Sequence, residues 1–308
     1  MNHDEVILGV DTHLDKHVGA VISVARRLLA TLAVETNSAG YLQLLAWARS
    51  LGDLRRAGVE GTATYGAGLT KVLRDNHVDV FEVNRPDRAT RRSRGKADPT
   101  DAESAACAVL SGRATAIPKE QSGAAYAMRA VAVARRSAVK ARTQAINQLR
   151  GLLVSAPQEI RERLLRTKTE ECVGACARIR SLGKTDLLTS LTTTLRILAK
   201  RWLALGAEIK LLDCQLEHLT KDHAPRLRNE FGVGAQTAAV LVCVAGDNPE
   251  RLKSEAALAA LCGVSPLQAS SGKTTRHRLN RVVIVPPTMP SGPSQWFECA
   301  AIRGLRHT

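Results

Sequence analysis

Aromatic residues are scarce in this 308-residue sequence, in which three Trp, three Tyr and three Phe make up 3% of the chain. Proteins that hold single-stranded nucleic acid stack its bases on aromatic side chains, so we expect no such platform here. Long apolar runs are also lacking, since the best candidate, residues 238–245, is far shorter than the roughly 20 residues of a membrane-spanning helix. The polar start of the chain is unlike a secretory leader. We therefore expect no membrane partner.

Cysteine is neither abundant nor even in number, with seven residues in the chain. A disulfide framework is not expected, and this composition favours a reducing compartment and a cytoplasmic location. Cys172 and Cys176 are one helical turn apart, but no second pair or suitably spaced His completes a zinc site. We expect both to be core residues.

Acidic residues are outnumbered: 29 Asp and Glu face 44 Lys and Arg, which leaves a formal net charge of +15. Such an excess attracts polyanions, of which nucleic acid is the commonest partner of a basic protein. The alternative is a basic protein whose charge only keeps it in solution. The length is typical of about two domains.

The first 115 residues predict a mixed α/β sheet flanked by helices. Short apolar runs joined by short links predict three antiparallel strands, and two further strands then alternate with helices. Asn37 and Ser38 are suited to cap the first helix. The predicted order is strand 6–10, strand 18–24, strand 28–34, helix 38–49, strand 58–61, helix 66–76, strand 78–83 and helix 98–110.

The rest of the chain predicts helices, then an irregular end. Residues 124–153 contain one Gly and no Pro, which indicates a long helix, and apolar residues, mostly Leu, repeat at heptad spacing over 195–219. This seam fits either a helical hairpin or an intermolecular coiled coil. Shorter helices are predicted at 235–244 and 252–261, whereas 282–308 has no helical period. We expect four regions: 1–115, 116–224, 225–281 and an irregular tail, 282–308.

Four acidic residues lie at the predicted ends of elements that should meet. Asp11 ends the first strand and Glu60 the fourth, and Asp98 and Asp101 share one face of a helix start. Four convergent carboxylates provide the hard oxygen ligands that Mg²⁺ or Mn²⁺ needs beside a phosphate. The alternative for residues 98–101 is an N-cap, a Pro at the first helical position and an acid in the first turn, which start a helix without chemistry.

Three motifs around these acids make the sequence recognisable. They are Gly9-Val10-Asp11-Thr12-His13 with Lys16, Val59-Glu60-Gly61-Thr62 with Tyr65-Gly66, and Lys96-Ala97-Asp98-Pro99-Thr100-Asp101-Ala102. With them the chain resembles the DEDD transposases of the insertion sequence 110 family, related to the Piv and MooV recombinases. The similarity covers residues 6–281 and includes Ala141-Arg142-Thr143-Gln144, Gly232-Val233-Gly234, Gly263-Val264-Ser265-Pro266 and Ser270-Ser271-Gly272.

The resemblance implies a fold and a reaction. It implies a RuvC-like domain of the ribonuclease H fold over 1–115, a long-helix, coiled-coil middle and a small, mostly α-helical C-terminal domain. Asp11, Glu60, Asp98 and Asp101 would hold Mg²⁺ or Mn²⁺, and Ser271 would be the nucleophile that forms a phosphoserine with a DNA strand. Ser270 is its confusable neighbour.

The resemblance also implies partners. They are donor and target DNA, a non-coding bridge RNA that guides recognition, and further copies of the chain in a dimer or tetramer. Each active site would combine the carboxylates of one subunit with the serine of another. The low aromatic content agrees with recognition of bases by RNA pairing.

Three basic segments are candidate phosphate contacts. One leads into Asp98, one lies on the long predicted helix, and one follows Ser271; the alternative for each is a solvated face. Their members are Arg85, Arg88, Arg91, Arg92, Arg94 and Lys96; Arg129, Arg135, Arg136, Lys140, Arg142 and Arg150; and Lys273, Arg276, Arg278 and Arg281.

Two rival functions remain open at this point. One is a metal-dependent nuclease or junction resolvase that uses the same acids with water as nucleophile, and the other is a non-catalytic nucleic-acid-binding remnant. The similarity to the family ends before residues 282–308, whose sequence is unlike that of its members. From this difference we predict that strand exchange is weak and that nucleic-acid binding is retained. His13 and His17 flank Asp11 either as supporting groups of the site or as ordinary surface and strand-end residues.

Overall fold

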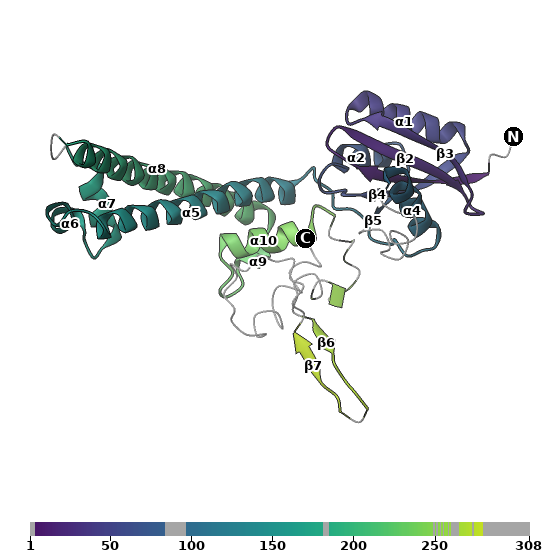
Figure 1. The fold of residues 1–308 in the computed structure, drawn as a ribbon. Helices are drawn as coiled ribbons and strands as arrows, with labels where there is room; N and C mark the ends of the chain where they lie inside the picture. Colours follow the sequence, from purple (N-terminus) through teal and green to yellow (C-terminus); the bar gives the residue numbers. More distant parts are fainter. Residues whose placement is uncertain are drawn as a thin grey trace. The chain divides into compact units, whose positions relative to one another are not determined.

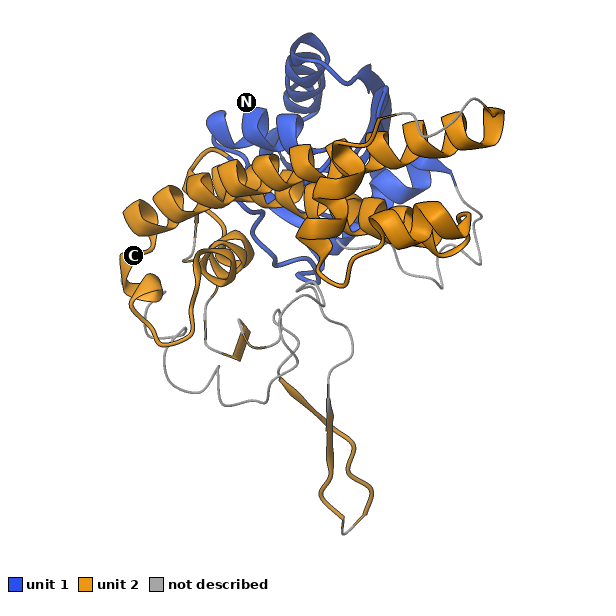
Figure 2. Cartoon of the chain, turned by 90° about the vertical axis from the view of Figure 1, so that its left-hand side faces the viewer, with its two compact units in different colours: residues 1–121 blue, residues 122–308 orange. Residues whose placement is uncertain are grey.

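The computed structural model describes residues 4–83, 97–180 and 185–248, together with 250, 252, 254, 256–257, 259, 265–272 and 274–279. The chain divides into two compact units, residues 1–121 and 122–308 (Figures 1 and 2). Unit 1 is a sheet with helices, and unit 2 consists largely of helices. No helix of the described residues is long and apolar enough to cross a membrane.

The five strands of unit 1 lie in the order β3-β2-β1-β4-β5. Strands β1 (Glu5–Thr12), β2 (Lys16–Ser23) and β3 (Leu28–Glu35) form an antiparallel meander. Strand β4 (Asp53–Glu60) runs parallel to β1, and β5 (Asp79–Val83) runs parallel to β4. The predicted mixed sheet is therefore confirmed, including the adjacency of its first and fourth strands.

Strand β4 is longer than the sequence predicts, because it begins at Asp53 and not at Gly58. The charged stretch at its start hides the strand from a pattern of alternating hydrophobicity. In the structure Arg56 reaches across to β1, where its Nη2 atom lies 2.8 Å from Oε1 of Glu5. A cross-strand ion pair thus accommodates a charge that a sequence pattern assigns to a loop.

Helices cover both faces of this sheet (Figure 1). Helices α1 (Ser38–Ser50) and α2 (Ala67–Asp75) bury Leu44 and Leu69 against one face, together with Leu8 of β1. Helix α4 (Asp98–Leu110) covers the other face, where Ala106 packs against Ile7. Since consecutive residues of β1 point to opposite faces and both faces are covered, residues 6–10 of this strand are apolar without interruption.

Unit 2 is built on two long helices, α5 (Ala124–Val154) and α8 (Asp186–His223), which lie side by side (Figure 2). The heptad seam of α8 faces α5: Leu195 and Trp202 share a core with Leu149, and Leu216 packs against Met128. Because later residues of α5 meet earlier residues of α8, the helices are antiparallel. The seam therefore has a partner within the chain, as in the helical-hairpin alternative.

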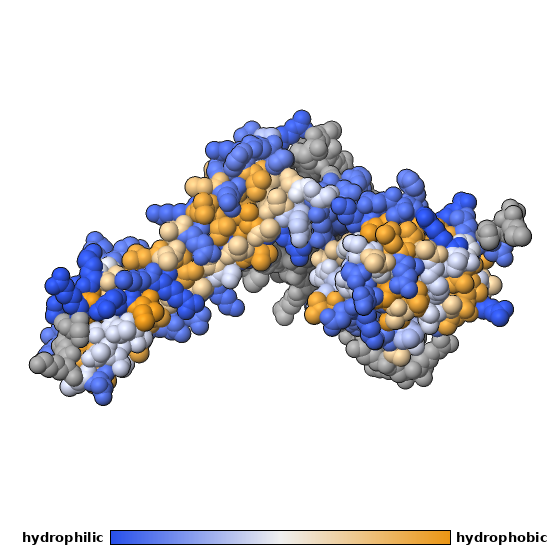
Figure 3. Space-filling view, turned by 90° about the horizontal axis from the view of Figure 1, so that it is seen from above, coloured by the Kyte–Doolittle hydropathy of each residue, from blue (hydrophilic) through white to orange (hydrophobic). Residues whose placement is uncertain are grey.

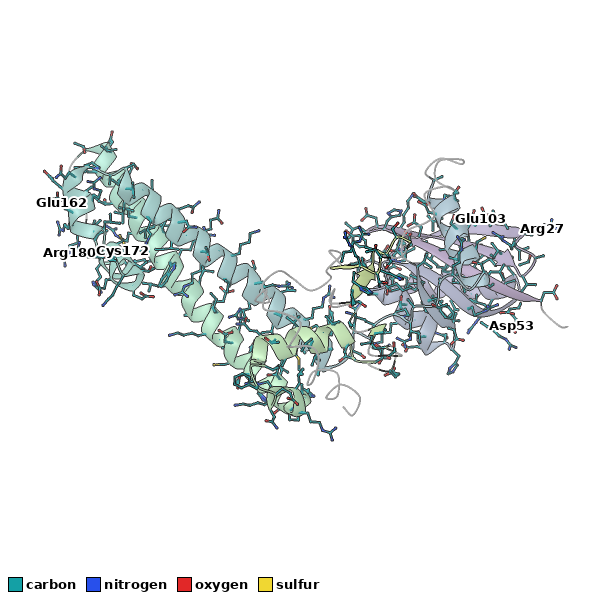
Figure 4. The ribbon with its side chains drawn as sticks, turned by 90° about the horizontal axis from the view of Figure 1, so that it is seen from below. Arg27, Asp53, Glu103, Glu162, Cys172 and Arg180 are labelled. Atoms are coloured by element: carbon teal, nitrogen blue, oxygen red, sulfur yellow. The ribbon has the colours of Figure 1, made fainter. Side chains whose placement is uncertain are left out.

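Short helices complete the two ends of the helix pair. At one end, α6 (Gln158–Leu164) and α7 (Thr169–Ala177) close a core that contains Cys172 and Cys176 (Figure 4). Both cysteines are fully buried, so they are core residues as predicted, and burial raises the pKa of Cys176 to about 12. At the other end, α10 (Ala235–Ala245) follows α9 (Pro225–Arg228) and packs Ala239 against α5 and α8.

A β-hairpin follows in the C-terminal part, where the sequence predicts only a polar, basic stretch. It pairs β6 (Pro266–Gln268) with β7 (His277–Leu279). Strands of three residues are too short to show an alternation of apolar and polar side chains, so the prediction of a mostly α-helical C-terminal domain did not include them. The predicted helix at 252–261 lies largely outside the described residues, and the predicted irregular tail at 282–308 lies wholly outside them.

Candidate active site

Strand register places Asp11 beside Glu60. In the parallel pair β1–β4, Gly9 is opposite Gly58 and Val10 is opposite Val59, so the next residues on each strand are the two acids. The hydroxyl of Thr12 donates a hydrogen bond of 2.9 Å to the backbone carbonyl of Glu60, which ties the two strand ends together. Both acids thus stand at the same edge of the sheet.

Two glycines allow α4 to lie directly on the strands that carry these acids. A Cβ atom on Gly9 would lie 2.0 Å from the carbonyl oxygen of Ala102, and one on Gly58 would lie 2.7 Å from that of Ala105. Side chains alternate along a strand, so Asp11 and Glu60, two residues beyond these glycines, face the same side as α4. One turn before Ala102 and Ala105, α4 begins with the other two acids.

Asp98 and Asp101 lie in the first turn of α4. The positive end of the helix dipole and the free amide groups there favour negative charge. The N-cap residue is Ala97, and no side chain caps this end, so the Asp98 carboxylate is not used to cap the helix. Asp101 is 3% exposed, and burying a carboxylate is costly unless it is paired with an opposite charge or hydrogen-bonded.

His13 lies between two of the acids, Asp11 and Asp98. The sequence alone does not show whether it supports the site or is an ordinary strand-end residue. Its Nε2 atom lies 3.2 Å from Oδ2 of Asp11 and 3.6 Å from Oδ1 of Asp98. The signal in the sequence is only its position two residues after Asp11. Its contact with Asp98 spans 85 residues of chain and is visible only in three dimensions.

The residues at this edge fit a divalent cation. One potential ligand atom from each of Asp11, His13 and Asp98 lies within 4.8 Å of the others. Asp11 is 6% exposed, and carboxylates this close repel one another unless a cation or proton intervenes. Carboxylate oxygens are the ligands that Mg²⁺ and Mn²⁺ prefer. Glu60, at the end of β4, and Asp101, in the first turn of α4, were predicted to complete this set but do not belong to the group of three.

His17, in contrast, lies at the same end of the sheet but is not a surface residue. It is fully buried and stacks on the ring of Tyr41 from α1, with ring centroids 5.5 Å apart. Strand β2 pairs it with Thr12, whose side chain faces away from that of Asp11. Burial lowers the pKa of His17. His17 does lie near the start of β2, as expected, but the expectation of a surface position was wrong because the meander and α1 enclose this residue.

In unit 2, Ser270 and Ser271 lie on the β6–β7 hairpin and differ in their hydrogen bonding. The Ser270 hydroxyl accepts a bond of 3.2 Å from the backbone amide of Arg276. Ser271 pairs with Thr274 through its backbone only, and within the described residues its exposed hydroxyl has no partner. Gly272 adopts a φ of 55°, which a tight hairpin turn requires. Of the two serines, Ser271 is therefore the one whose hydroxyl makes no hydrogen bond to another described residue.

The predicted basic residues have different surroundings. Arg85, Arg88, Arg91, Arg92, Arg94, Lys96, Lys273 and Arg281 lie outside the described residues, and Arg276 and Arg278 are exposed on the hairpin. On α5, Arg135 pairs with Asp213, and the Arg142 guanidinium lies 3.8 Å from the centre of the Trp202 ring. These two arginines have partners on α8.

The exposed basic residues of α5 form one line. Arg129, Arg136 and Lys140 are separated by seven and four residues, so they follow each other along one face of the helix. We call them the α5 basic stripe. Helix α5 contains no Asp or Glu over its 31 residues. Along this helix, no acidic side chain competes with a phosphate for these cations.

Two protein-family models match the chain. Residues 8–156 match the DEDD_Tnp_IS110 model, described as a transposase, and residues 224–283 match one described as the Transposase IS116/IS110/IS902 family. The first match contains all four acids and His13, and the second contains Ser270 and Ser271. No curated protein matches the chain.

Proposed function

The chain belongs to the IS110 family of transposases, and we propose that it cleaves and rejoins DNA strands at the carboxylate site of unit 1 with Ser271 as nucleophile. The observation that carries this proposal is the convergence of Asp11 and Asp98 on His13 at the sheet edge. The mixed sheet, with acids at the ends of β1 and β4, supports a RuvC-like ribonuclease H fold for unit 1.

In the proposed site, Asp11, Glu60, Asp98 and Asp101 hold Mg²⁺ or Mn²⁺. When bound, the cation supplies Lewis-acid stabilisation of the charge on the reacting phosphate. The chain's contribution is a rigid frame: Asp11 is fixed by β1, and Asp98 and Asp101 by the first turn of α4, which lies on Gly9 and Gly58. Such placement matters because an error of about 1 Å can cost a hundredfold in rate.

Serine chemistry distinguishes a recombinase from a hydrolytic nuclease. In the proposed step, the Ser271 oxygen bonds to a backbone phosphorus, one sugar–phosphate ester bond breaks, and the leaving oxygen takes up a proton. The proton lost by Ser271 passes to a carboxylate or to water. One ester replaces another and no water is consumed, so a second hydroxyl can reverse the step and rejoin the strand. This assignment is supported by the Ser270 hydroxyl, which accepts a hydrogen bond from Arg276, whereas that of Ser271 bonds to none of the residues that the structure describes.

The α5 basic stripe is the proposed contact for a nucleic-acid backbone in unit 2. Its three cations lie on a helix without acids, and Arg and Lys bind phosphates by charge without reading sequence. We propose that a guide RNA reads the donor and target DNA, in agreement with the 3% of aromatic residues. Arg135 and Arg142 then keep α5 and α8 together.

We further propose that the protein acts as a dimer or tetramer. Unit 2 exposes apolar side chains on both long helices, among them Val133 of α5 and Ile197 and Leu211 of α8. Figure 3 shows hydrophobic residues at the surface along the helical unit. A second copy of the chain is the proposed cover for them, and it would let the carboxylates of one subunit act with the serine of another.

A cleavage assay with matched variants tests this function. Purified protein, its guide RNA and DNA with the ends of its element are incubated with Mg²⁺ or with a chelator. We expect cleavage by the wild type only with Mg²⁺, and loss of cleavage in Asp11→Asn with nucleic-acid binding retained. Cleavage by Asp11→Asn, or by the wild type in the chelator, would exclude the carboxylate site. Binding without cleavage under any condition would favour a non-catalytic remnant.

A further inference from the structure

We propose that His13 is a nitrogen ligand of the divalent cation in unit 1 and makes the site prefer Mn²⁺ to Mg²⁺. This inference rests on the proposed carboxylate site and adds a residue to it. The four acids alone provide only oxygen ligands, which suit both cations. The imidazole is what would separate them, because nitrogen ligands suit transition metals better than Mg²⁺.

The distances around His13 match those of ligands on one metal. Its Nε2 atom is 3.2 Å from Oδ2 of Asp11 and 3.6 Å from Oδ1 of Asp98. With metal–ligand distances of about 2.1 Å in an octahedral site, neighbouring ligands lie roughly 3 Å apart. Small side-chain movements are therefore enough to place the three groups on one face of an octahedron.

The backbone holds His13 in this position. Its amide donates a hydrogen bond of 3.2 Å to the carbonyl of Lys16, which closes the turn between β1 and β2. Its own carbonyl accepts a bond of 3.3 Å from the hydroxyl of Thr36, which follows β3. The backbone of His13 is thus anchored by the meander, whereas Asp98 comes from the first turn of α4.

Exposure gives His13 a distinct place in the site. Its side chain is 43% exposed, whereas that of Asp11 is 8% exposed. Asp11 therefore forms the buried wall of the site and His13 its outer rim. A ligand on the rim tunes which cation is held without being needed for the fold of the sheet.

Binding of Mn²⁺ to the full-length protein tests the proposal through a readout other than activity. Pulsed electron paramagnetic resonance of bound Mn²⁺ detects a directly coordinated nitrogen as a modulation of the echo. We expect this nitrogen modulation in the wild type and its loss in His13→Ala, with Mn²⁺ affinity about tenfold lower and Mg²⁺ affinity within about twofold of the wild type. His218→Ala, which removes an exposed imidazole of α8, is the matched control and should change neither.

The outcomes separate this inference from the proposed function. If Mn²⁺ binds to the wild type and Asp11→Asn abolishes binding, but the nitrogen modulation is absent or persists in His13→Ala, His13 is not a ligand and the carboxylate site stands. If Mn²⁺ does not bind to the wild type, both fail. Circular dichroism of each variant confirms that the comparison is between folded proteins.

Discussion

Replacing Gly9 by alanine should displace α4 and disturb the carboxylate site without touching an acid. The added Cβ would lie 2.0 Å from the Ala102 carbonyl oxygen and 2.4 Å from the Ala106 amide nitrogen. Both are backbone atoms, so no side chain can turn away to make room. Reaching a normal contact of about 3.5 Å requires α4 to move by roughly 1.5 Å. Overpacking of this kind costs about 1–3 kcal/mol.

Hydrogen exchange measured by mass spectrometry reports the loss of stability separately for each unit of the intact chain. A loss of about 2 kcal/mol corresponds to roughly thirtyfold faster exchange of the most protected amides of β1 and α4. The affinity for the divalent cation should also fall, because Asp98 and Asp101 move with α4. Gly151→Ala is the control, since nothing lies within 4 Å of its Cβ on α5 and alanine favours a helix. If Gly9→Ala exchanges and binds cations like the wild type, the proposed packing of α4 on β1 is wrong.

Three further predictions address charge, pH and assembly. Replacing all three residues of the α5 basic stripe by alanine should reduce the slope of log affinity for duplex DNA against log salt concentration by about 2.7. The control, Arg27→Ala on the β2–β3 turn (Figure 4), should change this slope by less than about one. Equal slopes in the two variants would show that the stripe does not contact DNA. Because burial lowers the pKa of His17, this histidine is protonated at a higher pH in the unfolded chain than in the folded one. The stability of unit 1 should therefore fall as the pH drops below about 6.5. In unfolding titrations His17→Phe should weaken this pH dependence, and a variant with the pH profile of the wild type would contradict the prediction. Asp11→Ala and Ser271→Ala proteins, each inactive alone, should recover strand exchange when mixed, and failure to do so would mean that acids and serine act within one subunit.

The sheet of unit 1 was predictable because its signals are local. Apolar strands with short links specify the meander, and Pro99 and Asp101 mark the start of α4. The start of β4 was not predictable, because Arg56 is compensated by Glu5, a residue 51 positions away. The β6–β7 hairpin was missed because each of its strands has only three residues, too few to show a pattern of alternating hydrophobicity.

The site was predictable only in part, because some of its residues are placed by local signals and others by contacts between elements that are distant in the sequence. The acids at the ends of β1 and β4 follow from strand order, and their facing toward α4 follows from Gly9 and Gly58 once the register is known. His13 depends on a contact with Asp98 between distant elements, which no local pattern encodes. The burial of His17 likewise depends on how α1 packs on the meander.

The most direct test of the central claim is to locate the covalent bond between protein and DNA. Protein trapped on labelled DNA with Mg²⁺ and guide RNA is digested, and the DNA-linked peptide is sequenced by mass spectrometry. We predict a phosphodiester on Ser271 that persists in Ser270→Ala and disappears in Ser271→Ala and in Asp98→Asn. Cleaved DNA with free ends and no linked peptide would show that water is the nucleophile and would contradict the account.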